Sequence, residues 1–195
     1  MAWGFAGTTV PPVAHGLTRR QEIAMNVEPP FHRIKIRVAA AIFQGGDIAL
    51  IRRTNSSGIT HYSLPGGNVE PAEGLLDALG RELLEELGLD LQRIETSPQF
   101  TWILDAMVNR PGGTPPRKIH LVYRLHLAQD DREGLRTHEY DELGEGTILW
   151  LPYRQTEEVH LFPPVPVWQL SSPSSSVDAT SCMLPPIDDS NFAWR

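Results

Sequence analysis

Three glutamates near the middle of the chain could bind a cation together. Glu82, Glu85 and Glu86 follow one another at spacings i, i+3 and i+4, and a helix places side chains at those spacings on one side. Like charges this close destabilise a helix unless an ion or a basic side chain neutralises them. Because hard divalent ions such as Mg2+ take oxygen ligands, the spacing predicts a divalent-metal site.

The glutamates lie in a segment, residues 67–89, that begins with a glycine-led turn. The pattern predicts a helix over residues 72–87, closed by Gly88 as a C-terminal cap. Leucines at helical spacing should form the stripe that packs on the rest of the protein and fixes the rotation of the helix. These leucines are Leu75, Leu76, Leu79, Leu83 and Leu87.

The same segment resembles the signature box of the Nudix hydrolases at every specified position. The matching residues are Gly67, Glu73, Arg81, Glu82, Leu83, Glu85, Glu86, Gly88 and Leu89. The resemblance covers about residues 34–170 and implies an α/β fold, namely an α/β/α sandwich with a mixed β-sheet. It also implies hydrolysis of the diphosphate linkage in a nucleoside diphosphate joined to another moiety, with Mg2+ or Mn2+ as the cofactor.

Within this family, the resemblance assigns the metal site to the helix and the turn before it. Glu85 and Glu86 are the first expected metal ligands, and the carbonyl of Gly66 is expected to bind the metal alongside them. Glu82 is either a third ligand or the general base, because members of the family differ on that point. A tight strand-to-helix turn is the alternative explanation of the glycines, and both explanations can hold together.

Arg81 is expected to act in catalysis through its neighbours. It lies four residues after Asp77 and four before Glu85, where it can pair with carboxylates and hold them in orientation. Glu73 lies more than two helical turns before the cluster. The resemblance gives Glu73 a structural role.

Enzymes of the family that this chain resembles often place a further catalytic or metal-binding glutamate in a loop that corresponds to the acidic residues 130–146. Glu139, Glu142 and Glu145 are the candidates, and Glu139 leads because its neighbours best match the usual approach to a final strand. A solvated acidic loop explains the same residues equally well.

Substrate-binding residues are harder to identify. Arg52, at the end of a predicted strand, and Arg117, in a loop at residues 109–118, are weak candidates for contact with phosphates. Solvated charges explain both as well. Four aromatic residues could stack on a base, although aromatics on strands usually pack in the core. They are Tyr62, Trp102, Tyr123 and Phe162.

Hydrophobic patterns predict the elements that position these residues. A strand over residues 34–43 and a partner over 48–52 should form a hairpin through Gly45 and Gly46. Residues 119–127 alternate most clearly and should form a central strand. Further strands are expected at 62–64, 100–104 and 147–151, and a helix at 152–159.

Composition divides the chain into three parts. Residues 1–30 are expected to form an N-terminal extension, with Met25 as a candidate physiological start, and residues 31–170 the hydrolase domain. Residues 171–195 are rich in serine and proline and are expected to be disordered.

The charge and the cysteine content limit the environment and the partners. A net charge of −7 argues against broad nucleic-acid binding, disfavours a cap-removing role and favours a small nucleotide-type substrate. The single cysteine, Cys182, suits a cytoplasmic protein, and no apolar run predicts membrane insertion. A homodimer is compatible with the sequence.

Two other functions deserve comparison with hydrolysis. A nucleotide sensor on the same fold would commonly have lost carboxylates of the box, and this chain has kept them. An isopentenyl diphosphate isomerase would be expected to carry a catalytic cysteine within the domain, whereas Cys182 lies in the tail. Both comparisons favour hydrolysis.

Overall fold

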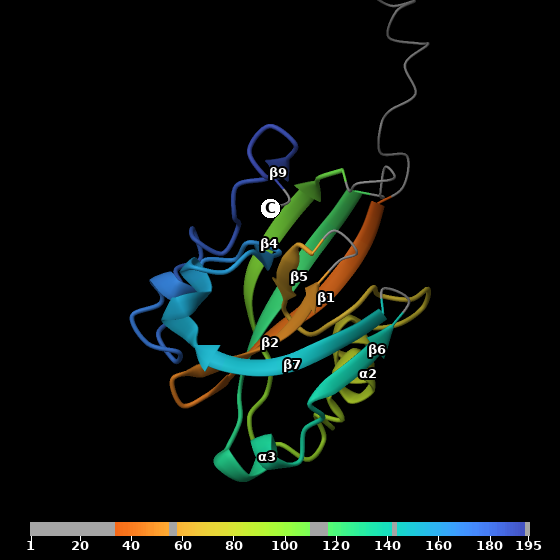
Figure 1. The fold of residues 1–195 in the computed structure, drawn as a ribbon, viewed down its shortest axis with the longest axis vertical. Coiled ribbons are helices and arrows are strands. Elements are labelled where there is room, and N and C mark those ends of the chain that lie inside the picture. Colours follow the sequence, from red (N-terminus) through yellow and green to blue (C-terminus); the bar gives the residue numbers. More distant parts are fainter. Residues whose placement is uncertain (1–33, 55–57, 110–116, 142–143, 194–195) are drawn as a thin grey trace, which may run out of the picture. The chain divides into compact units, whose positions relative to one another are not determined.

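A computed structural model of the chain describes residues 34–54, 58–109, 117–141 and 144–193 (Figure 1). The predicted extension at residues 1–30, including Met25, lies outside the described residues. Within the described helices, none combines the length and the apolar character needed to cross a membrane.

Strand β1 (Ile34–Gln44) forms the centre of the sheet. Its first residues, IKIR, are exposed or half-buried and give way to a fully buried stretch from Val38 to Phe43. It pairs in parallel with β5 (Arg117–His126) along nearly its whole length. At its other end, Gly45 adopts a φ of 59° and turns the chain into antiparallel β2 (Asp47–Thr54). The predicted hairpin is therefore confirmed.

The remaining strands extend this sheet in both directions. The order is β6-β7-β2-β1-β5-β4-β9, and β3 pairs with both β2 and β8. Parallel and antiparallel pairs both occur, so the predicted mixed α/β fold is confirmed. The bounds are β3 (Thr60–Ser63), β4 (Gln99–Met107), β6 (His138–Asp141), β7 (Gly144–Pro152), β8 (Leu161–Phe162) and β9 (Ile187–Asp188).

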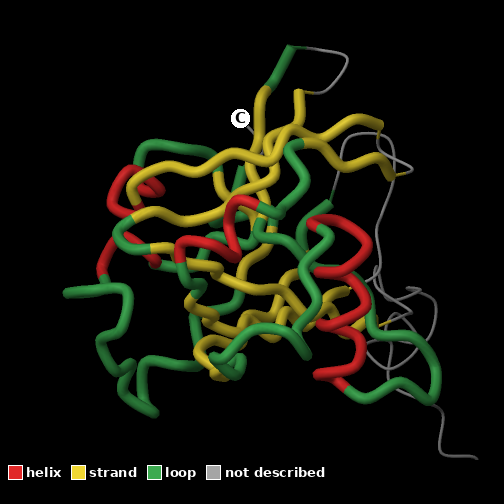
Figure 2. Tube along the Cα trace, turned by 90° about the horizontal axis from the view of Figure 1, so that it is seen from below, coloured by secondary structure: helices red, strands yellow, loops and turns green. Residues whose placement is uncertain are grey.

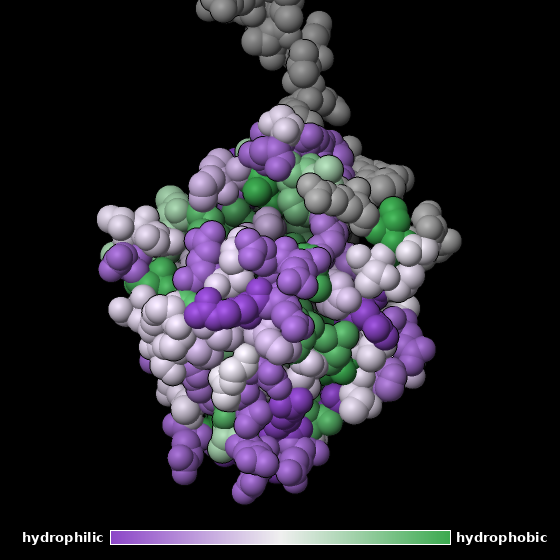
Figure 3. Space-filling model, turned by 60° about the vertical axis from the view of Figure 1, so that its left-hand side comes forward, coloured by the Kyte–Doolittle hydropathy of each residue, from purple (hydrophilic) through white to green (hydrophobic). Residues whose placement is uncertain are grey.

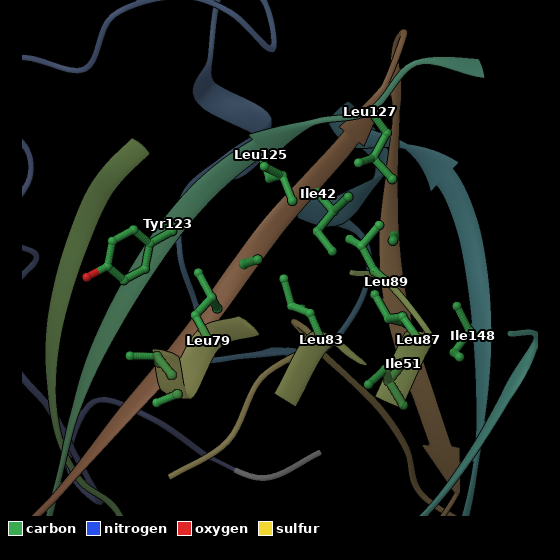
Figure 4. Close-up of a cluster of buried hydrophobic side chains, with 14 residues drawn as sticks. Ile42, Ile51, Leu79, Leu83, Leu87, Leu89, Tyr123, Leu125, Leu127 and Ile148 are labelled. Carbon is green, nitrogen blue, oxygen red and sulfur yellow. The ribbon is translucent and has the colours of Figure 1, made fainter. Parts of the chain in front are cut away.

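Helix α2 (Leu75–Leu87) lies against one face of the strands (Figure 2). Leu79, Leu83 and Leu87 are buried and point towards the strands (Figure 4). Gly88 adopts a φ of 72°, which confirms the predicted left-handed cap. The helix starts later than predicted because Ala72 has a φ of 66°, outside the helical region.

The late start corrects the prediction for the first two leucines of the stripe. Leu75 and Leu76 occupy the first turn of α2 and are 39% and 53% exposed. The buried stripe is therefore formed by Leu79, Leu83 and Leu87, with Ala78. Because these residues are on the sheet side, the helix is rotated as expected, with Glu85 turned towards solvent.

The opposite face of the sheet is covered by short helices and extended chain. Helix η1 (Tyr153–Glu157) and helix η2 (Val167–Gln169) contribute buried residues to this second core, as do Leu161 and Val165. The helix predicted at residues 152–159 is thus a short 3-10 helix. A short α-helix, α3 (Gln129–Glu133), lies between β5 and β6.

The segment after Leu170 packs on the domain, which corrects the expectation of a disordered tail. The Ile103 N–H donates to the carbonyl of Cys182 at 2.8 Å, and the Leu184 N–H donates to the carbonyl of Ile103 at 2.9 Å. Strand β9 then pairs with β4. The serine-rich composition did not indicate that the apolar residues Val177 and Leu184 pack against the second core.

On the side that Figure 1 has on its left, hydrophilic residues predominate and hydrophobic surface gathers in smaller areas (Figure 3).

Candidate active site

The site begins at a turn that runs beside β1. The Val38 N–H donates to the carbonyl of Gly67, and the Ala40 N–H donates to the carbonyl of Pro65, both at 2.9 Å. At Gly66 the φ is 138°, and a Cβ there would overlap the carbonyl oxygen of Val38. Only glycine fits at this position without strain, so the turn is fixed against the strand.

Glu86 is bound to this turn by its side chain. The Gly66 N–H donates to Glu86 Oε2 at 2.7 Å. The pKa of the Glu86 carboxyl is raised to about 7, mainly by burial, and the charge of Glu82 contributes to the rise. The hydrogen bond from Gly66 and the charges of Arg37 and Arg53 act in the opposite direction. Glu86 is therefore a partly buried carboxylate that gains from a further positive charge.

Glu82 reaches the same turn, whereas Glu85 does not. A Cβ added to Gly67 would overlap the Glu82 carboxylate, so the absence of that atom makes room for the charge. The Glu82 side chain is 15% exposed and the Glu85 side chain 60% exposed. The spacing predicted that all three carboxylates meet at one point, and the structure brings Glu82 and Glu86 to the turn while leaving Glu85 at its solvent side.

Arg81 connects most of these groups. Its guanidinium donates to both oxygens of Glu73, at 2.9 and 3.1 Å, to Glu82 Oε1 at 2.9 Å and to Glu85 Oε2 at 3.4 Å. It also donates to the carbonyl of Asn68 at 3.2 Å. The hydrogen bond to Glu73 is the main cause of the raised pKa of Arg81, with Glu82 contributing less. Arg81 thus holds three box carboxylates, those of Glu73, Glu82 and Glu85, and the turn in one arrangement.

The hydrogen bonds from Arg81 also hold the Glu73 side chain in place. Its pKa is lowered first by the hydrogen bond from Arg81 and then by the Glu70 N–H, which donates to Glu73 Oε2 at 3.1 Å. Glu73 lies before the first residue of α2. These contacts agree with the structural role that the resemblance implies.

A buried ion pair lies close to Glu86. Glu139 on β6 pairs with Arg53 on β2, and their exposed fractions are 4% and 8%. A Cβ on Gly146 would lie 2.9 Å from Glu139 Oε1, so this glycine also makes room for a carboxylate. Because the charge of Arg53 acts on the pKa of Glu86, the pair belongs to the site.

The sequence suggested Arg52, the neighbour of Arg53, as a candidate for phosphate contact and did not single out Arg53. Arg52 is exposed, whereas Arg53 lies on the same face of β2 as the buried residues Ala49 and Ile51. Strand alternation could have found this, since residues two apart share a face. The exposed position of Arg52 leaves its proposed phosphate contact without structural support.

The other candidates lie away from the Gly66–Gly67 turn or outside the described residues. Arg117 donates to both carboxylate oxygens of Asp105, at 2.8 Å from its Nε, and so forms a pair between β4 and β5. Glu145 accepts from the Tyr140 hydroxyl at 3.1 Å and is largely exposed. Glu142 lies outside the described residues. Glu139 is therefore the loop glutamate that the structure brings to the site.

The donor set suits a hard divalent cation. Glu82, Glu86 and the Gly66 carbonyl offer oxygen atoms alone, and the burial of Glu86 leaves a charge to be neutralised. Arg37 donates to the Gly66 carbonyl, which keeps a second lone pair. Among the described residues, no three acidic, histidine or cysteine side chains are gathered as a metal site. Arg81 accounts for part of this, since it holds Glu82 and Glu85.

Replacing Gly66 by alanine is expected to lower the free energy of unfolding by about 3 kcal/mol, because the new Cβ would overlap backbone in a strained conformation. Gly67→Ala should cost less, since the Cβ would displace the flexible Glu82 side chain instead. Urea unfolding measures both. Gly46→Ala is the control, because its Cβ would meet nothing within 4 Å. Equal losses at Gly66 and Gly46 would contradict this description of the turn.

Comparison with known proteins gave three kinds of match. A family model described as the NUDIX domain matches residues 33–167. The m7GpppN-mRNA hydrolase NUDT17 of Bos taurus is 34% identical over 144 residues, which are 68% of this chain and 46% of that protein. The chain therefore spans about half the length of this curated relative.

Solved structures also match over most of their length. The solution structure of the E. coli ORF135 protein shares 26% sequence identity with a TM-score of 0.48, covering 70% of this chain and 87% of that one. The crystal structure of a MutT NUDIX hydrolase from Burkholderia pseudomallei shares 23% identity with a TM-score of 0.46. That match covers 63% of this chain and 85% of the other.

Proposed function

The chain belongs to the Nudix family, and from this premise we propose that it is a metal-dependent hydrolase of phosphoric anhydrides. Its substrate would be a nucleoside diphosphate linked to another moiety. The observation that carries the proposal is the meeting of two carboxylates, from Glu82 and Glu86, at the glycine turn beside β1. Such a site suits a cation and, with it, an anionic diphosphate.

The cation would be held by the carboxylates of Glu82 and Glu86 and by the Gly66 carbonyl, with Glu85 contributing from the solvent side. Mg2+ fits this all-oxygen set, and Mn2+ is the alternative. When bound, the ion neutralises charge on the diphosphate and makes a water molecule more acidic. Arg81 keeps Glu82 and Glu85 in place through its hydrogen bonds.

Glu139 is the general base that we favour, and Glu82 is its rival. A base must be ionised and aimed at the water from which it takes the proton. The ion pair with Arg53 compensates the charge of Glu139 in a buried position and fixes its direction. Glu82 has an arginine partner too, but its position at Gly67 suits a ligand as well as a base.

Two substrate classes follow from different observations. The overall charge of −7 favours small substrates such as ADP-ribose, nucleotide sugars or nucleoside triphosphates. The bovine relative is named as a hydrolase of m7GpppN-mRNA, which favours a capped end as the second class. Both classes contain a phosphoric anhydride attached to a nucleoside.

A substrate panel tests the proposed activity. ADP-ribose, a nucleotide sugar, nucleoside triphosphates, dinucleoside polyphosphates and an m7GpppN cap analogue are incubated with Mg2+, with Mn2+ and with a chelator. Turnover of at least one compound that stops with the chelator is expected. Tight binding without turnover would favour the nucleotide sensor, and cleavage of the cap analogue alone would favour the second class. An isomerase would convert isopentenyl diphosphate and leave the panel intact.

Location and assembly are part of the proposal. A cytoplasmic location agrees with the single cysteine, Cys182. Its side chain is partly buried, and its Sγ donates a hydrogen bond to the carbonyl of Ala179. Size-exclusion chromatography with light scattering tests the homodimer that the sequence allows.

A further inference from the structure

Three aromatic rings meet on the sheet face opposite to α2. Phe192, from the C-terminal segment, has its ring centroid 5.4 Å from that of His160 and 5.5 Å from that of Phe162. Phe162 belongs to β8, which pairs with β3. All three side chains are partly exposed, so the cluster offers aromatic surface to solvent. Partly exposed aromatic rings can stack on a nucleobase.

Basic side chains lie beside these rings, on the first residues of β1 and β5. Lys35 is directly opposite Lys118, and Arg37 is directly opposite His120. Alternation places all four on the face of Ala39 and Val122, opposite to α2. Lys35, Lys118 and Arg37 form a basic strip on this face, whereas His120 is fully buried. The strip contrasts with the net charge of −7 of the chain.

Direct contacts connect the basic strip and the rings to the candidate active site. Arg37 donates to the Gly66 carbonyl, and its charge acts on the pKa of Glu86. His120, opposite Arg37, packs edge-on against Phe162 with centroids 5.4 Å apart. The path from Gly66 through Arg37 and His120 to the rings is thus continuous, and it extends roughly 15 Å at ordinary strand spacing.

We propose that the nucleoside half of the substrate lies along this path, with its base on the cluster of His160, Phe162 and Phe192 and its phosphates towards Arg37. The inference rests on the proposed function and adds a binding site to it. A nucleoside diphosphate has the required chemistry, since it carries an aromatic ring at one end and negative charge at the other. The diphosphate would then meet the carboxylate-bound cation at the Gly66 turn.

Anchoring of the C-terminal segment is the other role that Phe192 could have. That segment is already held by backbone hydrogen bonds at Ile103 and by the pairing of β9 with β4. Replacement of Phe192 should therefore leave the segment in place. The ring can then serve a ligand in addition to its packing contacts.

The test compares two non-hydrolysable ligands that differ by the nucleoside. Adenosine 5′-(α,β-methylene)diphosphate and methylenediphosphonate are titrated into the full chain by calorimetry, in the presence of Mg2+. Phe192→Ala should weaken the first ligand roughly tenfold and leave the second unchanged, because only the first has a base that stacks on the ring. Phe192→Leu, which keeps apolar bulk, should behave in the same way. Lys35→Gln with Lys118→Gln should weaken both ligands.

Phe100→Ala is the matched control, because Phe100 is 50% exposed and packs on Tyr123, a residue of the core on the α2 side. It should change neither affinity. The proposal would be overturned by an unchanged nucleotide affinity in Phe192→Leu or by equal weakening of both ligands in Phe192→Ala. No binding of the nucleotide by the natural chain would overturn it as well. If Phe192→Ala weakened only the nucleotide while the natural chain hydrolysed no compound of the panel, the binding site would be supported. The proposed hydrolase function would then be wrong.

Discussion

Glu86→Gln is expected to lower kcat on the best substrate of the panel by about 10³-fold while the fold is kept. The amide oxygen of glutamine can still accept the hydrogen bond from Gly66, so the turn is maintained. The negative charge that would hold the cation is lost. Removal of a charge that a metal requires costs several kcal/mol in the transition state, which corresponds to this loss.

The same variant should make the metal-free protein more stable at neutral and higher pH. The pKa of Glu86 is raised from 4.5 to about 7, mainly by burial, so the folded state holds its proton more tightly than the unfolded state does. Stability from this group is complete below pH 4.5 and is lost as the pH rises through 7. The glutamine side chain of the variant does not ionise and has no such loss, so the gain at pH 8 should be on the order of 2 kcal/mol.

Thermal unfolding with a chelator, at pH 4 and at pH 8, measures this gain. Glu95→Gln, at an exposed loop position, is the control and should shift stability at neither pH. Added Mg2+ should stabilise the natural chain and not the Glu86→Gln variant. Near-normal turnover by the variant would refute the role of Glu86, whatever its stability.

Sequence patterns predicted the parts of the fold that local chemistry determines. The buried run after Arg37 specified β1, and the glycines at 45 and 88 specified a hairpin and a helix cap. The C-terminal segment was mispredicted because its pairing with β4 depends on distant residues such as Ile103. Composition reports average character and does not report which few apolar residues find a partner surface.

The candidate site likewise contains residues that the sequence predicted and residues that it did not. The shared position of Glu82 and Glu86 was predicted from the sequence because a helix fixes their spacing. The resemblance supplied Gly66 as a candidate metal ligand. The burial of Glu139 could not be predicted from the sequence, because it depends on the pairing of β6 with β7 and on the space left at Gly146. Arg53 was overlooked in favour of Arg52, since two adjacent arginines differ only in the face of the strand that each occupies.

The Arg53–Glu139 pair should behave as one unit in catalysis and as two opposite charges in folding. If Glu139 is the base, Glu139→Gln should lower kcat by about 10³-fold. Arg53→Gln should have a similar effect, because Arg53 acts by holding Glu139. The double variant should lose no more than either single variant, which is the signature of residues that act together.

Stability should follow a different pattern in the same three variants. Each single substitution leaves a buried charge without its partner, which costs about 3 kcal/mol, and the double substitution removes both charges and should recover most of that cost. Urea unfolding and kcat are therefore measured together. Arg132→Gln, which removes a pair with Asp47, is the control and should not change kcat. If the double variant regained hydrolysis along with stability, the pair would be structural and Glu82 would become the leading base.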